Sequence, residues 1–170
     1  MSKPVCLVTG VGPGTGAACV RRFAESYEVA MMARNSERLE NIASEVPGTH
    51  VYTCDVTDTD ALHAQLEQVR SDLGDPHVLV HNAVGGAFGS FLEIDPAVLE
   101  ANFQVNTMSL LHLGRALAPA MIQRSEGSIV VTANTSAFRG SANFAGFAPT
   151  KAAQRILAEA MARDLGPKGV

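Results

Sequence analysis

Short apolar runs alternate with longer amphipathic stretches along this chain, and this alternation limits the fold more than any other feature. The runs are rich in β-branched residues and end near Gly, Asp or Asn, as buried strands do. They cover residues 5–10, 28–33, 50–55, 77–82 and 128–133. The stretches between and after them predict helices over residues 14–26, 36–46, 58–73, 96–123 and 145–165. Strict alternation of this kind requires parallel strands with right-handed crossovers. We therefore predict an α/β fold, a Rossmann-type doubly wound parallel sheet with helices on both faces.

The length of the chain, 170 residues, predicts a single domain over residues 1–170. The C-terminal sequence, RDLGPKGV, ends a helix at Gly166–Pro167 and predicts the start of another strand at residues 169–170. Because a sheet of this class normally continues past this point, we expect C-terminal strands to be missing from the domain.

Composition and charge argue against several kinds of partner. The net charge is −4 and there is no basic block, so neither nucleic acid nor an anionic membrane is expected as a partner. No apolar run approaches the roughly 18 residues of a spanning helix. The three cysteines and five histidines lack metal-ligand spacing, so no metal site is predicted. The N-terminus enters a strand-like run without a charged leader, and we expect a cytoplasmic protein with reduced thiols.

A glycine-rich segment, VTGVGPGTGAA (residues 8–18), follows the first predicted strand and opens the first predicted helix. Glycines in this position let the backbone turn tightly and approach a pyrophosphate, while the helix N-terminus offers N–H groups and a positive dipole end. A P-loop is excluded because it needs Lys and then Ser or Thr after the last glycine, whereas Ala17 and Ala18 follow Gly16. The segment predicts dinucleotide binding.

The spacing T-G-x-x-x-G-x-G in this segment differs from the common G-x-G-x-x-G pattern. It resembles the short-chain dehydrogenase/reductase family. Four further segments match motifs of that family in the same order: CDVTD (54–58), HNAVGG (81–86), FQVNT (103–107) and FAPTK (147–151). The resemblance covers residues 4–170 and implies a set of dinucleotide-binding residues. These are Thr9, Gly10, Gly12, Gly14, Thr15, Gly16, Asp55, Val56, Asn82, Ala83 and Lys151.

The end of the second predicted strand indicates which dinucleotide is bound. Selectivity for NAD relies on a carboxylate there that bonds the ribose hydroxyls, but Ala33 stands in its usual place. Arg34 comes next, and a guanidinium pairs with a phosphate through two hydrogen bonds. Asn35 adds a small polar group. We predict NADP(H), with NAD(H) as the less favoured cofactor; the alternative is that Arg34 is only a solvated loop residue.

The catalytic residues implied by the resemblance are present only in part. In the resembling family a tyrosine exchanges a proton with the substrate oxygen, a lysine holds the nicotinamide ribose, a serine positions the carbonyl and a helix asparagine maintains a water relay. Lys151 and Asn106 match the lysine and the asparagine. Phe147 stands at the tyrosine position and Asn134 at the serine position. Asn134 can still donate a hydrogen bond, whereas Phe147 can transfer no proton. A structural role is the alternative for Lys151, and a helix kink or cap for Asn106.

Two functions follow from this pattern. The first is an NADP(H)-dependent short-chain oxidoreductase that moves hydride between nicotinamide and a carbonyl or enoyl substrate, with an altered proton donor. The second is a catalytically silent dinucleotide-binding sensor or partner subunit. The only tyrosines, Tyr27 and Tyr52, are expected on the adenine side of the sheet, too far away to replace the missing proton donor.

The resemblance also implies partners. A homodimer or homotetramer is expected through the helices at about 96–123 and 145–165. The segments that remain of the substrate wall, residues 85–91 and 139–144, are small and apolar and weakly favour an apolar small-molecule substrate.

Overall fold

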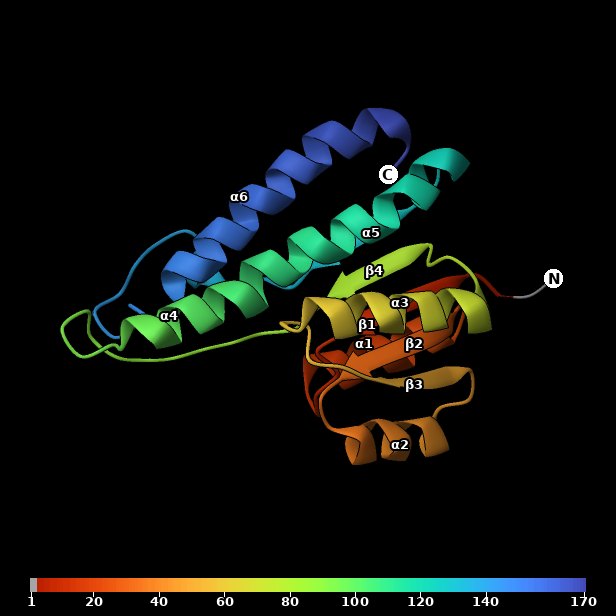
Figure 1. The fold of residues 1–170 in the computed structure, drawn as a ribbon, viewed down its shortest axis with the longest axis horizontal. Helices are drawn as coiled ribbons and strands as arrows, with labels where there is room; N and C mark the ends of the chain where they lie inside the picture. Colours follow the sequence, from red (N-terminus) through yellow and green to blue (C-terminus); the bar gives the residue numbers. More distant parts are fainter. Residues whose placement is uncertain (1–2) are drawn as a thin grey trace.

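Five parallel strands form the centre of the computed structural model, which describes residues 3–170. The strands are β1 (Val5–Thr9), β2 (Glu28–Ala33), β3 (Thr49–Thr53), β4 (Val78–His81) and β5 (Ser128–Val131). They pair in the order β3-β2-β1-β4-β5, with every neighbouring pair parallel (Figure 1). Four of them lie within the predicted apolar runs and β3 begins one residue before its run, so the predicted doubly wound α/β fold is confirmed.

The two faces of the sheet bury separate apolar cores, because successive residues of a strand point to opposite sides. On one face Val8 packs among residues of α1 (Thr15–Ala24) and α2 (Ser36–Glu45). On the other face Leu7 packs among residues of α3 (Thr59–Leu73) and of the long helix after β4. β1 is paired on both sides and fully buried, as its apolar sequence VCLVT requires.

The helix predicted over residues 96–123 has three segments in the structure. It consists of α4 (Pro96–Phe103), a wide π-helical turn η1 (Gln104–Met108) and α5 (Ser109–Arg124). Asp95 caps α4 by accepting the N–H of Ala97. The predicted helix is therefore confirmed without a break, but its π turn was not predicted. This turn contains Asn106, whose amide bonds to groups outside the helix.

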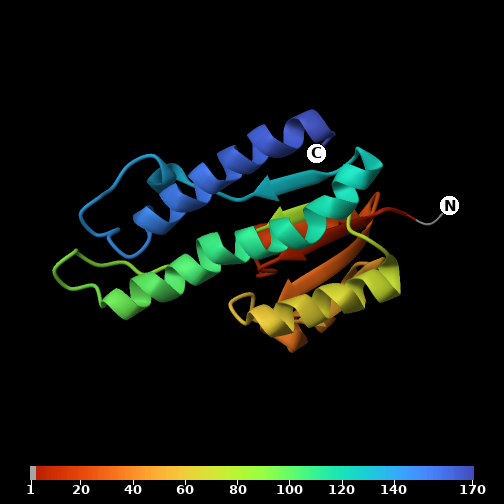
Figure 2. The same cartoon turned by 45° about the horizontal axis from the view of Figure 1, so that its top comes forward.

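The last helix, α6 (Ala148–Leu165), lies beside α5 in both views (Figures 1 and 2). The two helices approach closely at Gly114, where an added Cβ would lie 2.5 Å from the Met161 methyl carbon. β5 precedes α6 and is linked to it by a loop that contains the short 3-10 turn η2 (Thr135–Ala137). No helix within residues 3–170 combines the length and hydropathy needed to cross a membrane.

The predicted start of a strand at residues 169–170 is wrong. A 3-10 turn η3 (Gly166–Lys168) follows α6, and Gly169 has a left-handed φ of 85°. The N–H of Val170 bonds back to the carbonyl of Leu165, and its side chain packs on the core beneath α3 and α5. The backbone therefore folds back toward α6 here and does not extend.

Candidate dinucleotide site

An open cleft of about 1220 Å³ lies at the carboxyl ends of β1, β2 and β4. In doubly wound sheets this edge is the usual place for ligands. The predicted cofactor residues line it, with two exceptions: Thr9 and Lys151 are buried outside its wall. The predicted residues in the wall are Gly10, Gly12, Gly14, Thr15, Gly16, Arg34, Asn35, Asp55, Val56, Asn82 and Ala83.

The glycines of the loop have two different roles. Gly10 has a φ of 69°, and an added Cβ would lie 2.4 Å from the Ala83 backbone. At Gly16 an added Cβ would lie 2.7 Å from the Gly10 carbonyl. These two glycines let the β1 loop pack against α1 and the end of β4. Around Gly12 and Gly14, in contrast, a Cβ would meet no atom within 4 Å, which leaves the backbone open to a ligand.

The start of α1 presents backbone N–H groups to this cleft. Gly14 is its N-cap, no side chain caps the first turn, and the first turn carries no acidic residue. The positive end of the helix dipole and the N–H groups therefore favour an anion. This geometry suits the pyrophosphate of a dinucleotide.

A basic corner of the cleft follows β2. Arg34 is exposed, and its guanidinium lies 3.9 Å from an Asp55 carboxylate oxygen. Arg38 lines the same corner, although the sequence analysis did not single it out. Asn35 lies between them and uses its amide oxygen to cap α2, accepting the Arg38 N–H at 2.8 Å. Arg38 could have been found from the sequence, because it is an arginine in the first turn of a helix that borders a glycine loop.

Asp55 remains a carboxylate in this position. Partial burial tends to raise its pKa, but the hydrogen bonds from the N–H and hydroxyl of Thr57 and the charge of Arg34 outweigh it, so the pKa is lowered overall. Its negative charge also holds the Arg34 guanidinium near the cleft. The pair is exposed, so it orients the arginine more than it stabilises the fold.

Beneath the loop lies His81, the last residue of β4. It is fully buried: Nδ1 lies 3.2 Å from the Thr9 hydroxyl and Nε2 lies 3.4 Å from the Ser109 hydroxyl. The Ser109 hydroxyl donates to the Val105 carbonyl, so its oxygen accepts from Nε2–H. Burial lowers the pKa of His81 to about 4; a backbone hydrogen bond with Asn106 opposes this shift and the Lys151 charge adds to it. The ring is neutral and joins β1 to the π turn.

A polar network connects the π turn to the start of α6. The Asn106 amide accepts the N–H of Gly85 at 3.0 Å and donates to the Gly85 carbonyl and the Thr150 hydroxyl, both at 2.8 Å. One turn earlier, Asn102 donates to the Gly146 carbonyl at 2.8 Å. The Asn106 side chain is therefore committed to protein groups. Asn102, another residue of the cleft wall, was missed because its partner is 44 residues away.

Lys151 is almost fully buried at the first turn of α6, with 3% of its surface exposed. Its ammonium donates to the Thr132 carbonyl at 3.0 Å and to the Gln154 side-chain oxygen at 2.6 Å. Burial lowers the pKa of Lys151 to about 8. Two of the three ammonium N–H bonds are thus used by β5 and α6.

Phe147 and Asn134 both precede Lys151 in the sequence, but they differ in exposure. Phe147 is buried, and its ring packs against Phe88, which in turn packs edge-on against Phe144. Asn134 is exposed and accepts the Ser136 N–H, which caps η2 and leaves its NH₂ group as a donor. Phe147 is therefore part of a buried apolar contact, whereas Asn134 keeps an amide donor at the surface.

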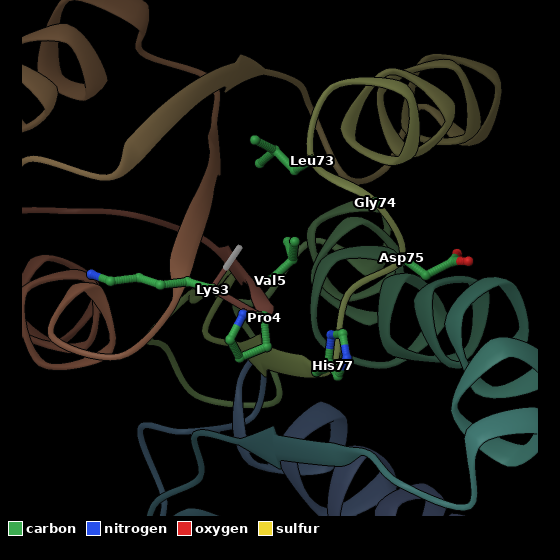
Figure 3. A pocket seen from close by; sticks show the side chains of 7 residues that line it. All are labelled: Lys3, Pro4, Val5, Leu73, Gly74, Asp75 and His77. Carbon is green, nitrogen blue, oxygen red and sulfur yellow. The ribbon is translucent and has the colours of Figure 1, made fainter. Parts of the chain in front are cut away.

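A second, smaller cavity of about 430 Å³ lies at the opposite end of the sheet (Figure 3). It is lined by the start of β1 and by the segment between α3 and β4, including Asp75 and His77. It contains none of the predicted site residues. Across residues 3–170, no three His, Cys, Asp or Glu side chains are placed to hold a metal ion.

Comparison with known proteins agrees with this geometry. A family model described as short chain dehydrogenase matches residues 4–170. L-xylulose reductase of Mesocricetus auratus is 32% identical over 163 residues, which are 95% of this chain and 65% of that protein. D-erythrulose reductase of Gallus gallus is likewise 32% identical over 163 residues, with the same shares covered. The chain therefore spans slightly less than two thirds of the length of these reductases.

Solved structures of the same kind superpose closely. A metagenomic short-chain oxidoreductase in complex with NADP has a TM-score of 0.94 and 30% identity, covering 100% of this chain and 80% of that one. L-sorbose reductase from Gluconobacter frateurii, complexed with NADPH and L-sorbose, has a TM-score of 0.92 and 26% identity, covering 99% of this chain and 66% of that one.

Proposed function

The chain belongs to the short-chain dehydrogenase family, and from this premise we propose that it is an NADP(H)-dependent oxidoreductase with an altered proton donor. The substrate is a small molecule with a carbonyl or enoyl group. When bound, the nicotinamide cofactor supplies or accepts the hydride at C4. The observation that carries the proposal is the open glycine cleft, where Gly12 and Gly14 leave room for a ligand against the N-terminus of α1.

The preference for NADP(H) is supported by the basic corner after β2. Arg34 and Arg38 both line the cleft there, and Ala33 offers no carboxylate. Arg34 supplies a planar pair of donors to a 2′-phosphate, and Arg38 adds positive charge. A similar oxidoreductase structure and a similar reductase structure are complexes with NADP and NADPH, which fits this assignment, while a similar xylitol dehydrogenase structure is bound to NAD+.

The altered proton donor is the finer part of the proposal. Phe147 takes the place of the family's motif tyrosine and Asn134 the place of its serine. The ring of Phe147 packs within an aromatic cluster, so it can shape an apolar pocket but cannot exchange a proton. Asn134 uses its amide oxygen to accept the Ser136 N–H, and in this proposal its NH₂ group would donate a hydrogen bond to a substrate oxygen.

Lys151 is the acid in this proposal. The Asn106 side chain is bonded to Gly85 and Thr150, so any part that Asn106 takes in a water relay would fall to its backbone. Its side chain joins the loop after β4 to α6. The buried Lys151 ammonium has a pKa near 8, close to the range where a general acid works best. A water held by its third N–H would carry the proton to the substrate.

A second function is favoured by Phe147. If the aromatic cluster around Phe147 leaves no proton path, the protein binds the dinucleotide without turnover, as a sensor or as a silent partner subunit. The cleft is built the same way in both cases, so cofactor binding alone does not separate them.

A combined binding and turnover experiment separates the two functions. Purified protein is titrated with NADPH and NADH by nicotinamide fluorescence, and cofactor oxidation is then followed with carbonyl and enoyl substrates. We expect tighter binding of NADPH and slow turnover, raised by about 10²-fold or more in the Phe147→Tyr, Asn134→Ser double variant.

Tight NADPH binding with turnover only in the double variant would establish the silent protein instead. Absence of binding to either cofactor would remove both functions. A Phe138→Tyr variant is the matched control, because it adds a phenol to an exposed ring outside the Phe88–Phe147 cluster.

We also propose an apolar substrate and a homodimer or homotetramer. The apolar substrate is supported by large side chains left exposed on the segment after β4: Phe88, Phe91 and Leu92. The oligomer is supported by the apolar stripe of α6, where Ile156 is 53% exposed while polar residues of the helix are buried. Size-exclusion chromatography with light scattering tests the oligomer directly.

A further inference from the structure

The buried face of α6 is unusually polar. Thr150, Lys151 and Gln154 are all buried on it, and Gln154 is only 1% exposed. Thr150 is explained by its bonds to Asn106 and to the Phe147 carbonyl. Gln154 is not explained by the fold or by the proposed chemistry, because its one hydrogen bond goes to Lys151.

The contact with Lys151 determines how the Gln154 amide is turned. Its oxygen lies 2.6 Å from the Lys151 nitrogen, and a flipped amide would place an NH₂ group against an ammonium. The amide nitrogen therefore points away, and it is buried without a hydrogen-bond partner among residues 3–170. An unpaired buried donor destabilises the fold, and an apolar side chain of the same length would avoid it. What the glutamine adds in return is the oxygen that accepts from the buried Lys151 ammonium.

The ammonium gains a defined direction from its two acceptors. The Thr132 carbonyl lies just after β5 and is 19 residues from Lys151 in the chain. The Gln154 oxygen comes from the next turn of α6, 3 residues away. With two N–H bonds fixed, the third has one remaining direction. Removing Gln154 would leave only the Thr132 carbonyl and let the ammonium rotate about it.

We propose that Gln154 is a positioning residue that aims the third N–H of Lys151 at the cofactor ribose and the substrate-side water. This inference rests on the proposed oxidoreductase function for its purpose, but its physical core, the control of Lys151 by Gln154, stands on the geometry of the unliganded protein. Gln154 touches neither cofactor nor substrate and acts only through the lysine.

The other polar groups around Lys151 are neutral or already bonded, so Gln154 is the partner whose substitution should change the lysine. His81 from β4 is the titratable neighbour, and it is neutral in the folded protein. In the π turn the amide of Asn106 is already bonded to Gly85 and Thr150. Arg155, next to Gln154 on α6, is bonded to the Ala137 carbonyl and to Glu159. No carboxylate among residues 3–170 contributes to the pKa of Lys151.

The first measurement is made on the free protein and needs no cofactor. The chain has only three lysines, Lys3, Lys151 and Lys168, so the side-chain signals of ¹³C-labelled lysine are assigned with two Lys→Arg variants and titrated by NMR. In Gln154→Met the acceptor is lost and the Lys151 pKa falls by about one unit. In Gln154→Glu the added carboxylate raises it by about one unit or more. Gln123→Met, an exposed glutamine on α5, is the matched control and leaves it unchanged.

The second measurement is the dissociation constant of NADPH across pH 6–9 for the same variants. We expect Gln154→Met to weaken binding about tenfold at pH 7 and to move the alkaline loss of binding to lower pH, and Gln154→Glu to move it to higher pH. If Gln154→Met does not fold, Gln154→Glu carries both measurements, since it keeps the shape and the acceptor.

An unchanged Lys151 pKa in both variants would overturn the proposal, as would a changed pKa with unchanged NADPH binding. If the wild-type protein binds neither NADPH nor NADH, the proposed function fails by itself. The pKa series in the free protein would still decide whether Gln154 controls Lys151.

Discussion

Different interactions shape two halves of the molecule. One half forms the cofactor cleft, and the other carries the candidate catalytic residues. Around β1, β2 and β3 the sheet is covered by apolar side chains, and the cleft itself depends on glycines. Around η1 and α6 the contacts that position the site are amide and hydroxyl hydrogen bonds between residues about 20–40 positions apart. Binding is therefore specified by local backbone shape, and chemistry by long-range polar pairing.

The largest effect should come from breaking the backbone shape of the cleft. Gly10→Ala places a Cβ 2.4 Å from the Ala83 backbone at a φ of 69°, so both strain and overlap oppose it. We expect the free energy of unfolding to fall by on the order of 3 kcal/mol or more, measured by urea denaturation.

Gly12→Ala is its matched control. No atom lies within 4 Å of the added Cβ, so stability should change by less than about 1 kcal/mol, while NADPH binding weakens because the methyl group occupies ligand space. Equal destabilisation by the two substitutions would show that the loop glycines do not divide into packing and ligand positions.

His81 joins the two halves, and pH tests that joint. The unfolded chain binds a proton on this histidine near pH 6.5, whereas the folded pKa is about 4 because burial disfavours the charged ring. Between these values the unfolded state holds more protons. The free energy of unfolding should therefore fall as the pH drops from 6.5 to 4, by up to about 1.4 kcal/mol per pH unit.

Above pH 6.5 His81 is neutral in both states, so it does not make the free energy of unfolding depend on pH. Urea melts at pH 5 and pH 7 measure the difference, and His81→Asn should show a smaller loss between these two pH values than the wild-type protein. A variant with the same acid sensitivity as wild type would mean that His81 is accessible to protons in the folded state.

The two halves also differ in how far the sequence predicts them. The five strands were predictable because apolar runs are local signals, and the cleft residues Asp55 and Asn82 because the short motifs that contain them resemble those of a known family. His81 and Gln154 were not, because their partners become neighbours only after β4, β5 and α6 have packed. The π turn was missed for the same reason: helical periodicity is nearly the same with or without one wide turn. The false strand at residues 169–170 shows how weak two residues are as a signal.

A smaller effect is expected at the basic corner. Arg34→Ala should raise the dissociation constant of NADPH by about tenfold to a hundredfold, because a charged hydrogen-bond pair to a phosphate is lost. NADH lacks that phosphate, so its dissociation constant should change by less than about twofold.

Fluorescence titration with both cofactors measures this preference. Arg22→Ala is the control, since Arg22 pairs with Glu25 on the outside of α1 and lies outside the cleft wall. Equal losses for NADPH and NADH in Arg34→Ala would assign Arg34 to the adenine or ribose and remove the stated preference for NADP(H).

The smallest effect, a pairwise coupling, bears most directly on the comparison between the halves. Asn106 and Thr150 are 44 residues apart and joined by a buried hydrogen bond of 2.8 Å. In a double-mutant cycle with Asn106→Leu and Thr150→Val, we expect a coupling free energy of about 1 kcal/mol, measured by urea denaturation. A cycle of Asn106→Leu with Asn35→Ala, the distant cap of α2, should give less than about 0.5 kcal/mol. If both cycles gave the same small value, the polar network would not hold η1 to α6. The start of α6 would then be held against η1 by apolar packing, as the cleft half is.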